Sequence, residues 1–284
     1  MTWTHHPVVG LTLSGGGARG LAHIGVLKVI ERRGLRIDCL SGASMGGILA
    51  ACYAAGMSAG ELEDVALHMA SLRRLIGLVD VRPPNRGLLA GHRVRAFFAR
   101  YLPPDLTFAD LRIPLALEAV DLHTGEEVAL REGSVLEAAL ATSAFPGVLP
   151  PVRWNGRLLV DGGLLDNMPV DLARAMGADF VIAVNVTPQP DDPSGSRAGA
   201  TQSMPSFLET AWNAVSIMCA ARLSTKMQLV APDVLVHPAL SHDMGVFSSF
   251  TRAAEIIARG RQAAEATLPH LAMLEARAPI PESA

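Results

Sequence analysis

Hydrophobic and polar residues follow one another along the chain in a pattern that predicts strands alternating with helices. Short apolar runs predict strands, and apolar residues recurring every three or four positions predict helices. Strands are expected at residues 8–13, 37–41, 113–121, 127–130, 157–160, 180–186 and 234–237. Helices are expected at residues 21–33, 45–56, 61–70, 134–142, 170–176, 207–230 and 251–274. This alternation predicts an α/β fold of three α/β/α layers, with a mostly parallel central sheet.

The chain is expected to form a single domain, because its 284 residues are within the range of one large domain and show no internal repeat. The motifs described below lie within a core at residues 8–186. Residues 187–206 contain four prolines and two glycines and are expected to form a mobile loop. Residues 207–284 are expected to form a helical C-terminal region.

Composition and charge exclude several classes of protein. Half of the residues are hydrophobic and 18% are charged, which excludes a wholly disordered chain. The net charge of −3 argues against a general nucleic-acid binder. Three scattered cysteines suggest neither a disulfide framework nor a zinc site, and the N-terminus lacks the pattern of a secretory signal. A cytoplasmic location is therefore expected.

An uncharged stretch of 22 residues, at 39–60, is long enough to cross a bilayer. It holds five glycines and three serines and follows a strand-like run. We therefore predict a strand, a tight turn and a buried helix there, and no membrane span.

The turn inside that stretch carries a candidate nucleophile. Residues 42–46 have the sequence Gly-Ala-Ser-Met-Gly, which fits the pattern G-x-S-x-G of a serine on a strained strand-to-helix turn. Gly42 and Gly46 permit the backbone of such a turn. Because an apolar strand precedes Ser44 and a helix follows it, an attacking alkoxide there would be favoured by the helix N-terminus.

A second glycine turn, at residues 15–20, has two interpretations. It fits the G-x-G-x-x-G of dinucleotide-binding folds, and Asp38 follows it by 18 residues. The ribose-binding acid of such folds ends the second strand, however, whereas Asp38 begins it. Gly15, Gly16 and Gly17 can instead offer backbone N–H groups to a developing oxyanion. Only this second interpretation explains the serine turn after the next strand.

A serine nucleophile needs a base, and two kinds of residue are candidates. The late histidines, His237, His242 and His270, have no distinctive local sequence. Asp161 ends an apolar strand and precedes two glycines, so its carboxylate is placed to reach a serine at the end of a neighbouring strand. A carboxylate acting alone must be a stronger base than usual, which a partly desolvated cleft provides.

Five segments together resemble the patatin-like phospholipase family, in particular its compact bacterial members. They are Ser-Gly-Gly-Gly-Ala-Arg-Gly at 14–20, Gly-Ala-Ser-Met-Gly at 42–46, Ala-Thr-Ser-Ala-Phe-Pro-Gly at 141–147, Asp-Gly-Gly at 161–163 and Asp-Asn-Met-Pro-Val at 166–170. The resemblance covers residues 8–186 and is less distinctive after 187.

The resemblance implies a patatin-like fold and a Ser-Asp dyad that works without histidine. It implies Ser44 as nucleophile, Asp161 as general base, and the backbone of Gly15, Gly16 and Gly17 as oxyanion hole, in a lipid acyl hydrolase with no metal and no cofactor. The residues that support these motifs are Ala18, Arg19, Gly20, Gly42, Gly46, Gly162 and Gly163.

Two charged residues near the motifs carry further expectations. Relatives often have asparagine where this chain has Asp166, and a second carboxylate is expected to raise the pKa of Asp161 if it points inward. Arg19 is expected to shape the glycine loop, with a lipid phosphate or a structural salt bridge as the other candidate roles.

The stretch at residues 71–100 contains seven arginines, one aspartate and several apolar residues. This composition suits an interfacial lid that contacts anionic headgroups, and equally a solvated helix face with a loop. The nine histidines include no H-x-x-x-H pair, so no metal site is predicted.

The sequence therefore favours a lipid acyl hydrolase that associates peripherally with membranes. It is expected to split an ester of a phospholipid, a lysophospholipid or a related lipid through an acyl-Ser44 intermediate. Two alternatives stay open: an acyltransferase with the same dyad, and a nucleotide-binding regulatory protein that uses residues 15–20.

Overall fold

The structure is a computed structural model that describes residues 7–78, 80, 90–187, 207–241, 243–245 and 249–268. Nearly all of the loop expected at 187–206 lies outside the described residues, and so does the end of the last expected helix, at 269–274. The same holds for the middle of the arginine-rich stretch, at 79 and 81–89.

The predicted α/β fold with a mostly parallel sheet is confirmed. The described part of the chain forms an eight-stranded sheet with the order β5-β6-β3-β2-β1-β7-β8, in which β4 also pairs with β3. Five strands run parallel to one another: β1, β2, β3, β7 and β8. The other three are antiparallel to their neighbours, since β4 and β6 each pair with β3 and β5 pairs with β6. The strands are β1 (Val9–Leu13), β2 (Cys39–Gly42), β3 (Leu115–Asp121), β4 (Glu127–Leu130), β5 (Val152–Trp154), β6 (Arg157–Asp161), β7 (Phe180–Val184) and β8 (Val234–Val236).

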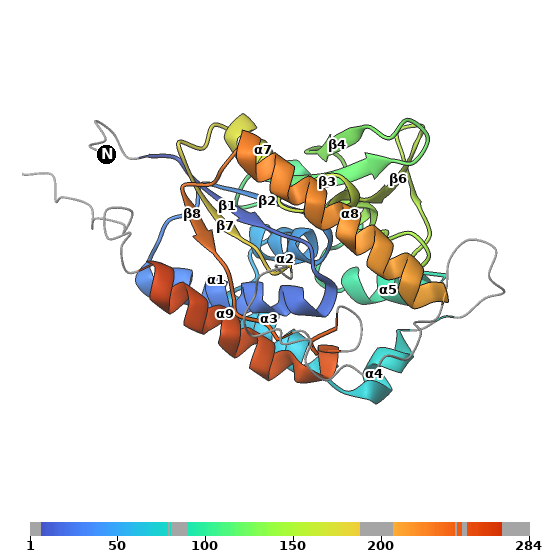
Figure 1. Cartoon of the computed structure of the whole chain (residues 1–284), viewed down its shortest axis with the longest axis horizontal. Coiled ribbons are helices and arrows are strands. Elements are labelled where there is room, and N and C mark those ends of the chain that lie inside the picture. The colour runs from blue at the N-terminus through green and yellow to red at the C-terminus, as the bar shows by residue number, and fades with distance from the viewer. Residues whose placement is uncertain are drawn as a thin grey trace, which may run out of the picture.

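Helices cover both faces of the sheet, which gives the three predicted layers (Figure 1). On one face, α1, α2, α3, α6 and α9 pack around the larger hydrophobic core, and on the other α7 and α8 enclose a smaller one. The helices are α1 (Ala22–Arg33), α2 (Ser44–Ala54), α3 (Ala59–Met69), α4 (Leu72–Gly77), α5 (His92–Phe98), α6 (Val135–Thr142), α7 (Val170–Ala175), α8 (Phe207–Leu229) and α9 (Ala253–Thr267). The described ranges also contain four short 3-10 helices: η1 (Gly17–Leu21), η2 (Phe108–Asp110), η3 (Gly162–Leu164) and η4 (Ser249–Arg252).

The uncharged stretch at 39–60 forms β2, a turn and α2, as the sequence predicts. Ala50, Ala51 and Ala54 on α2 are fully buried, so the lack of charge reflects a helix enclosed by the domain. Among the described residues, no helix combines the length and apolar character that a bilayer crossing requires.

Three short elements were not predicted. β5 forms a hairpin with β6 through Asn155 and Gly156, whose φ values are +45° and +80°. An Asn-Gly pair between two strands is a strong hairpin signal. The arginine-rich stretch contains α4 and α5, whose polar faces hide their helical period.

The strand pairing brings the carboxyl ends of β2 and β6 together. On one edge, β3 pairs with β4 at both Leu117 and Ala119. On its other edge, Leu117 pairs with Gly42 at the end of β2, and Ala119 pairs with Asp161 at the end of β6. β2 and β6 therefore share one edge of β3. They approach each other head to head, because β2 is parallel to β3 and β6 is antiparallel to it. The junction between their ends, opposite Glu118, is called the seam below.

Candidate active site

Ser44 lies on a sharp turn between β2 and α2. Its φ of +52° falls in the left-handed region, which is uncommon for any residue but glycine and is typical of strained functional positions. The flanking glycines are required by space, since a Cβ at Gly46 would lie 2.4 Å from the carbonyl oxygens of Leu13 and Ser14. A Cβ at Gly42 would lie 2.9 Å from the nitrogen of Gly47. The G-x-S-x-G pattern thus forms the predicted strand-to-helix turn.

Asp161 meets Ser44 across the seam. The Ser44 hydroxyl donates to Oδ2 of Asp161 at 2.7 Å, and the Gly163 N–H donates to Oδ1 at 2.8 Å. Gly162 keeps the turn close to β3, because a Cβ there would lie 2.2 Å from the carbonyl oxygen of Glu118. The predicted nucleophile and the predicted base are therefore in direct contact.

Burial makes the Asp161 carboxylate a stronger base than an ordinary aspartate. The residue is 1% exposed. Burial raises its pKa to about 7, against the opposing effect of the hydrogen bonds from Ser44 and Gly163. A carboxylate with this pKa takes a proton from a hydroxyl more readily near neutral pH, as a general base must.

The glycine loop at residues 15–17 lies beside Ser44, but its first amide is already engaged. The Gly15 N–H donates to the carbonyl oxygen of Asn167 at 3.0 Å. A Cβ at Gly15 would lie 2.9 Å from Cβ of Ser44, so the loop needs a glycine to come this close. Gly17 lines the same cavity as Ser44. The Gly15 amide is therefore not available to an oxyanion, and the predicted oxyanion hole is reduced to the amides of Gly16 and Gly17.

Three residues with no role predicted from the sequence fix these turns. His23 Nε2 donates to the carbonyl oxygen of Ser14 at 2.7 Å, and burial lowers the pKa of His23 to about 4, so the ring is neutral. Asn167 is wedged between the two loops, because a Cβ at Gly15 or Gly163 would lie within 2.5 Å of its Oδ1. The third residue is Thr142, whose hydroxyl accepts from the N–H of Ser44 at 3.1 Å. Asn167 and Thr142 fall in segments that carried the family resemblance, whereas His23 had no sequence signal.

Arg19 shapes the glycine loop from inside the protein. It is 3% exposed, and its guanidinium donates to the carbonyl oxygen of Val186 at 2.8 Å. Longer hydrogen bonds reach the carbonyl oxygens of Leu240, Ser241 and Met244. These contacts agree with the loop-shaping role and tie the glycine loop to the C-terminal region. The buried guanidinium is poorly placed for a lipid phosphate.

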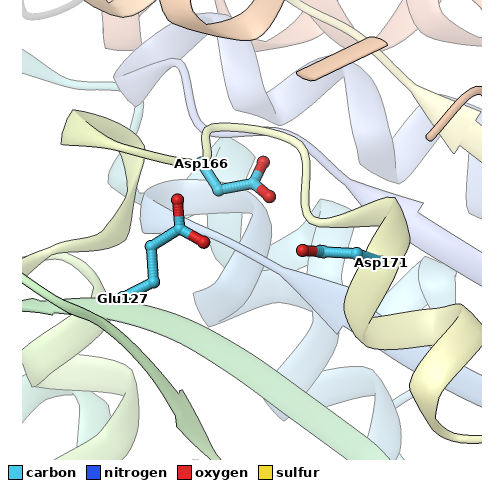
Figure 2. Close-up of side chains that lie close together, drawn as sticks. All are labelled: Glu127, Asp166 and Asp171. Carbon is cyan, nitrogen blue, oxygen red and sulfur yellow. The ribbon is translucent and has the colours of Figure 1, made fainter. Parts of the chain in front are cut away.

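Asp166 does not raise the pKa of Asp161, because its carboxylate points to a different group of side chains, so the condition for that effect is not met. Its carboxylate faces those of Glu127 and Asp171 (Figure 2). Lys226 of α8 lies among the three, with Nζ 2.8 Å from Glu127, 3.0 Å from Asp166 and 3.1 Å from Asp171. The raised pKa of Asp161 therefore comes from burial.

The three carboxylates in Figure 2 are the ligand type that hard divalent cations prefer. The Lys226 ammonium already occupies the position between them, so we interpret the group as an ion-pair cluster that attaches α8 to the domain. The neighbouring Glu118 is 2% exposed. Burial, reinforced by the carboxylates of Asp166, Glu127 and Asp171, raises the pKa of Glu118 to about 9, so that it stays protonated at neutral pH.

A large apolar cavity opens at the dyad. Its volume is about 660 Å³, and both Ser44 and Asp161 line it. This size is typical of pockets that enclose small molecules. The walls are almost entirely apolar and come mainly from α2, α3, α4 and α5; they include Met45, Ile48, Leu49, Leu62, Val65, Ala66, Met69, Leu75, Val94, Phe97 and Phe98.

The described part of the arginine-rich stretch forms one wall of this cavity. Leu72 and Ile76 of α4 line it while remaining 67% and 58% exposed. Arg73 and Arg74 lie on the same short helix and are exposed to solvent. Arg82 and Arg86 lie outside the described residues. The stretch thus combines exposed apolar and cationic side chains beside the site.

The arrangement does not favour the dinucleotide interpretation. Asp38 lies before β2, where Oδ2 accepts from the N–H of Val9 at 2.9 Å and Oδ1 pairs with Arg36. It is therefore at the amino end of the sheet, whereas the glycine loop follows the carboxyl end of β1. Of the late histidines, His242 and His270 lie outside the described residues. The hydroxyl of Ser44 donates to Asp161 and not to a histidine.

Comparison with known proteins agrees with the geometry. A model of the family described as Patatin-like phospholipase matches residues 11–174. An uncharacterized NTE family protein of Mycobacterium tuberculosis is 34% identical over 208 residues, which cover 72% of this chain and 54% of the relative. Patatin-like phospholipase domain-containing protein 6 of Homo sapiens is 34% identical over 185 residues, covering 64% of this chain and 13% of that protein. This chain therefore spans about half the length of the mycobacterial relative.

A solved structure has a similar fold. The crystal structure of VipD from Legionella pneumophila superposes with a TM-score of 0.52, covering 93% of this chain and 67% of that chain. The sequence identity is 14%, so this likeness concerns the fold alone.

Proposed function

This chain belongs to the patatin-like phospholipase family, and on that premise we propose that it is a serine lipid acyl hydrolase. The observation that carries the proposal is the 2.7 Å hydrogen bond from the Ser44 hydroxyl to the buried Asp161 carboxylate, at the end of an apolar cavity. A nucleophile, a base of raised pKa and a dry space for an acyl chain are what ester cleavage of a lipid requires.

The proposed reaction has two steps. In the first, Ser44 Oγ attacks the ester carbonyl while Asp161 takes the hydroxyl proton, and the amides of Gly16 and Gly17 stabilise the oxyanion. Asp161 then gives the proton to the departing alcohol or lysolipid, which leaves an acyl-Ser44. In the second step, water attacks this acyl group with Asp161 again as base. The acyl chain lies in the apolar cavity throughout, with the carbonyl at its polar end.

We expect a fluorophosphonate probe to label the protein, with the modified peptide mapping to Ser44. Chromogenic acyl esters should be hydrolysed by the parent, while Ser44→Ala should show neither labelling nor turnover above background. Labelling at another residue, or full turnover by Ser44→Ala, would remove Ser44 from the reaction. Adding a lysolipid or alcohol acceptor and analysing the products separates hydrolysis from acyl transfer.

We also propose that α4 contacts the surface of an anionic membrane. Leu72 and Ile76 are large exposed apolar side chains that line the cavity, and Arg73 and Arg74 lie between them on the same helix. Exposed apolar side chains that enter the headgroup region, accompanied by arginines, are typical of interfacial contact with anionic lipid. A lipid ester would then enter the cavity directly from the bilayer.

Replacing both Arg73 and Arg74 with glutamine is expected to weaken binding to anionic vesicles about 30-fold, since each arginine near such a surface contributes about 1 kcal/mol. Sedimentation with vesicles containing phosphatidylserine measures the effect, which should disappear at high salt. Arg32→Gln is the matched control: it removes an exposed arginine from the last turn of α1, at the amino end of the sheet. Equal binding by all variants would contradict the proposed contact.

A further inference from the structure

The seam between β2 and β6 leaves one backbone carbonyl of β3 without a strand partner. Gly42 pairs with Leu117 and Asp161 pairs with Ala119, so Glu118 lies between the two strand ends. Its carbonyl oxygen faces the seam, since a Cβ at Gly162 would lie 2.2 Å from it. A buried carbonyl in this position needs a donor from outside the sheet.

Thr142, the last residue of α6, supplies that donor. It is fully buried, and its hydroxyl donates to the Glu118 carbonyl oxygen at 2.5 Å. The hydroxyl oxygen of Thr142 in turn accepts from the N–H of Ser44 at 3.1 Å. A hydroxyl has one proton to give, so donation to Glu118 leaves its lone pairs for the Ser44 amide. That amide is in the first turn of α2 and has no carbonyl partner within the helix.

Thr142 also contacts the turn through its methyl group. A Cβ at Gly47 would lie 2.9 Å from Cγ2 of Thr142, so this methyl packs directly against the first turn of α2. The side chain therefore touches Ser44 and Gly47 on the nucleophile's side of the seam and Glu118 on the other. It does not line the cavity that contains the dyad.

We propose that Thr142 is a positioning residue, whose hydroxyl holds the strained Ser44 backbone at the distance from Asp161 that proton transfer requires. The inference rests on the proposed function, because it concerns the same serine. Without the hydroxyl, the Ser44 N–H and the Glu118 carbonyl both lose a buried partner, and the turn relaxes away from its φ of +52°. A misplacement of about 1 Å costs roughly 10²-fold in rate.

The parent and three variants at position 142 separate the effect of the hydroxyl from that of the methyl group. Thr142→Ser keeps the hydroxyl and loses the methyl, Thr142→Val keeps the shape and loses the hydroxyl, and Thr142→Ala loses both. We expect kcat and the rate of fluorophosphonate labelling to fall about 10²-fold in the valine and alanine variants, with KM nearly unchanged. The serine variant should stay within about 3-fold of the parent. If the valine variant does not fold, the comparison of the serine variant, which keeps the hydroxyl, with the alanine variant, which loses it, tests the proposal.

Thr12→Val is the control for loss of a buried hydroxyl in the same sheet. Thr12 is fully buried and its hydroxyl pairs with that of Ser41 at 2.8 Å, without contact to Ser44. It should lower thermal stability while leaving kcat close to that of the parent. The proposal would be overturned if the serine variant lost activity while the valine variant kept it, because the methyl group would then be the important part. It would also be overturned if kcat fell in proportion to thermal stability in all variants, Thr12→Val included. A parent that is not labelled at Ser44 at all would instead overturn the proposed function.

Discussion

Replacing Asp161 with asparagine is expected to lower kcat by about 10²- to 10⁴-fold, because the proposed general base is lost while the shape of the side chain is kept. The pH dependence should change with it. For the parent, kcat/KM is expected to rise with pH through about 7, where Asp161 ionises. The variant should lack this rise. Initial rates with a soluble acyl ester between pH 5 and 9 measure both effects.

The same variant is expected to be more stable than the parent at alkaline pH. Burial raises the pKa of Asp161 from 3.8 to about 7, so the stability contributed by the protonated form is present below 3.8 and is lost as pH rises through 7. Asparagine carries no charge to bury. The free energy of unfolding of Asp161→Asn should therefore exceed that of the parent by up to about 4 kcal/mol at pH 8, and match it at pH 3.5.

Asp166→Asn is the matched control for these two effects. It removes a carboxylate from the same loop that contacts Lys226 rather than Ser44. We expect it to keep the parent's rise in kcat/KM near pH 7. An Asp161→Asn variant with parental turnover, or an identical pH profile in parent and variant, would show that another group acts as the base.

Replacing Lys226 with methionine is expected to lower the free energy of unfolding by about 2 to 4 kcal/mol, because it leaves Asp166 and Asp171 close together without their cation. Glu127 keeps its ion pair with Arg222. The Asp166 side chain is only 2% exposed, so solvent screens it weakly. Burial alone would lower the pKa of Lys226, but the hydrogen bonds to Glu127 and Asp166 raise it, so the ammonium is retained. Urea denaturation at pH 7 measures the loss.

Two comparisons make the Lys226 experiment specific. Arg32→Met removes an exposed ion pair with Glu265 and should cost less than about 0.5 kcal/mol. Adding Asp166→Asn to Lys226→Met should recover part of the loss, because one of the uncompensated carboxylates is then neutral. A Lys226→Met variant as stable as the parent would mean that the cluster does not attach α8 to the domain.

Much of the fold was predictable because the strands and helices of the core have clear hydrophobic periods. β4 lies at the predicted residues, and most other elements differ from expectation by one or two residues at their ends. Ser134 caps α6 as expected, accepting from the N–H of Glu137. β5 has three residues, too few for an alternating pattern, and α4 and α5 carry many exposed arginines that mask their period.

The candidate site was predictable where backbone chemistry leaves a mark in the sequence. Close approach at Gly42, Gly46 and Gly162 excludes side chains, and runs of glycine reveal such positions. The contribution of Thr142 could not be predicted, because its hydroxyl acts between strand ends whose meeting depends on the antiparallel insertion of β6. The orientation of Asp166 was equally hidden, since it depends on Lys226 in the distant α8.

The head-to-head meeting of β2 and β6 also has a consequence for biosynthesis. The serine turn follows the second strand of the chain, but its aspartate partner is 117 residues further along. During translation Ser44 therefore leaves the ribosome well before Asp161, and the proposed dyad forms only when β6 docks against β3. On the proposed mechanism, a nascent chain gains hydrolase activity only after its second half has been made.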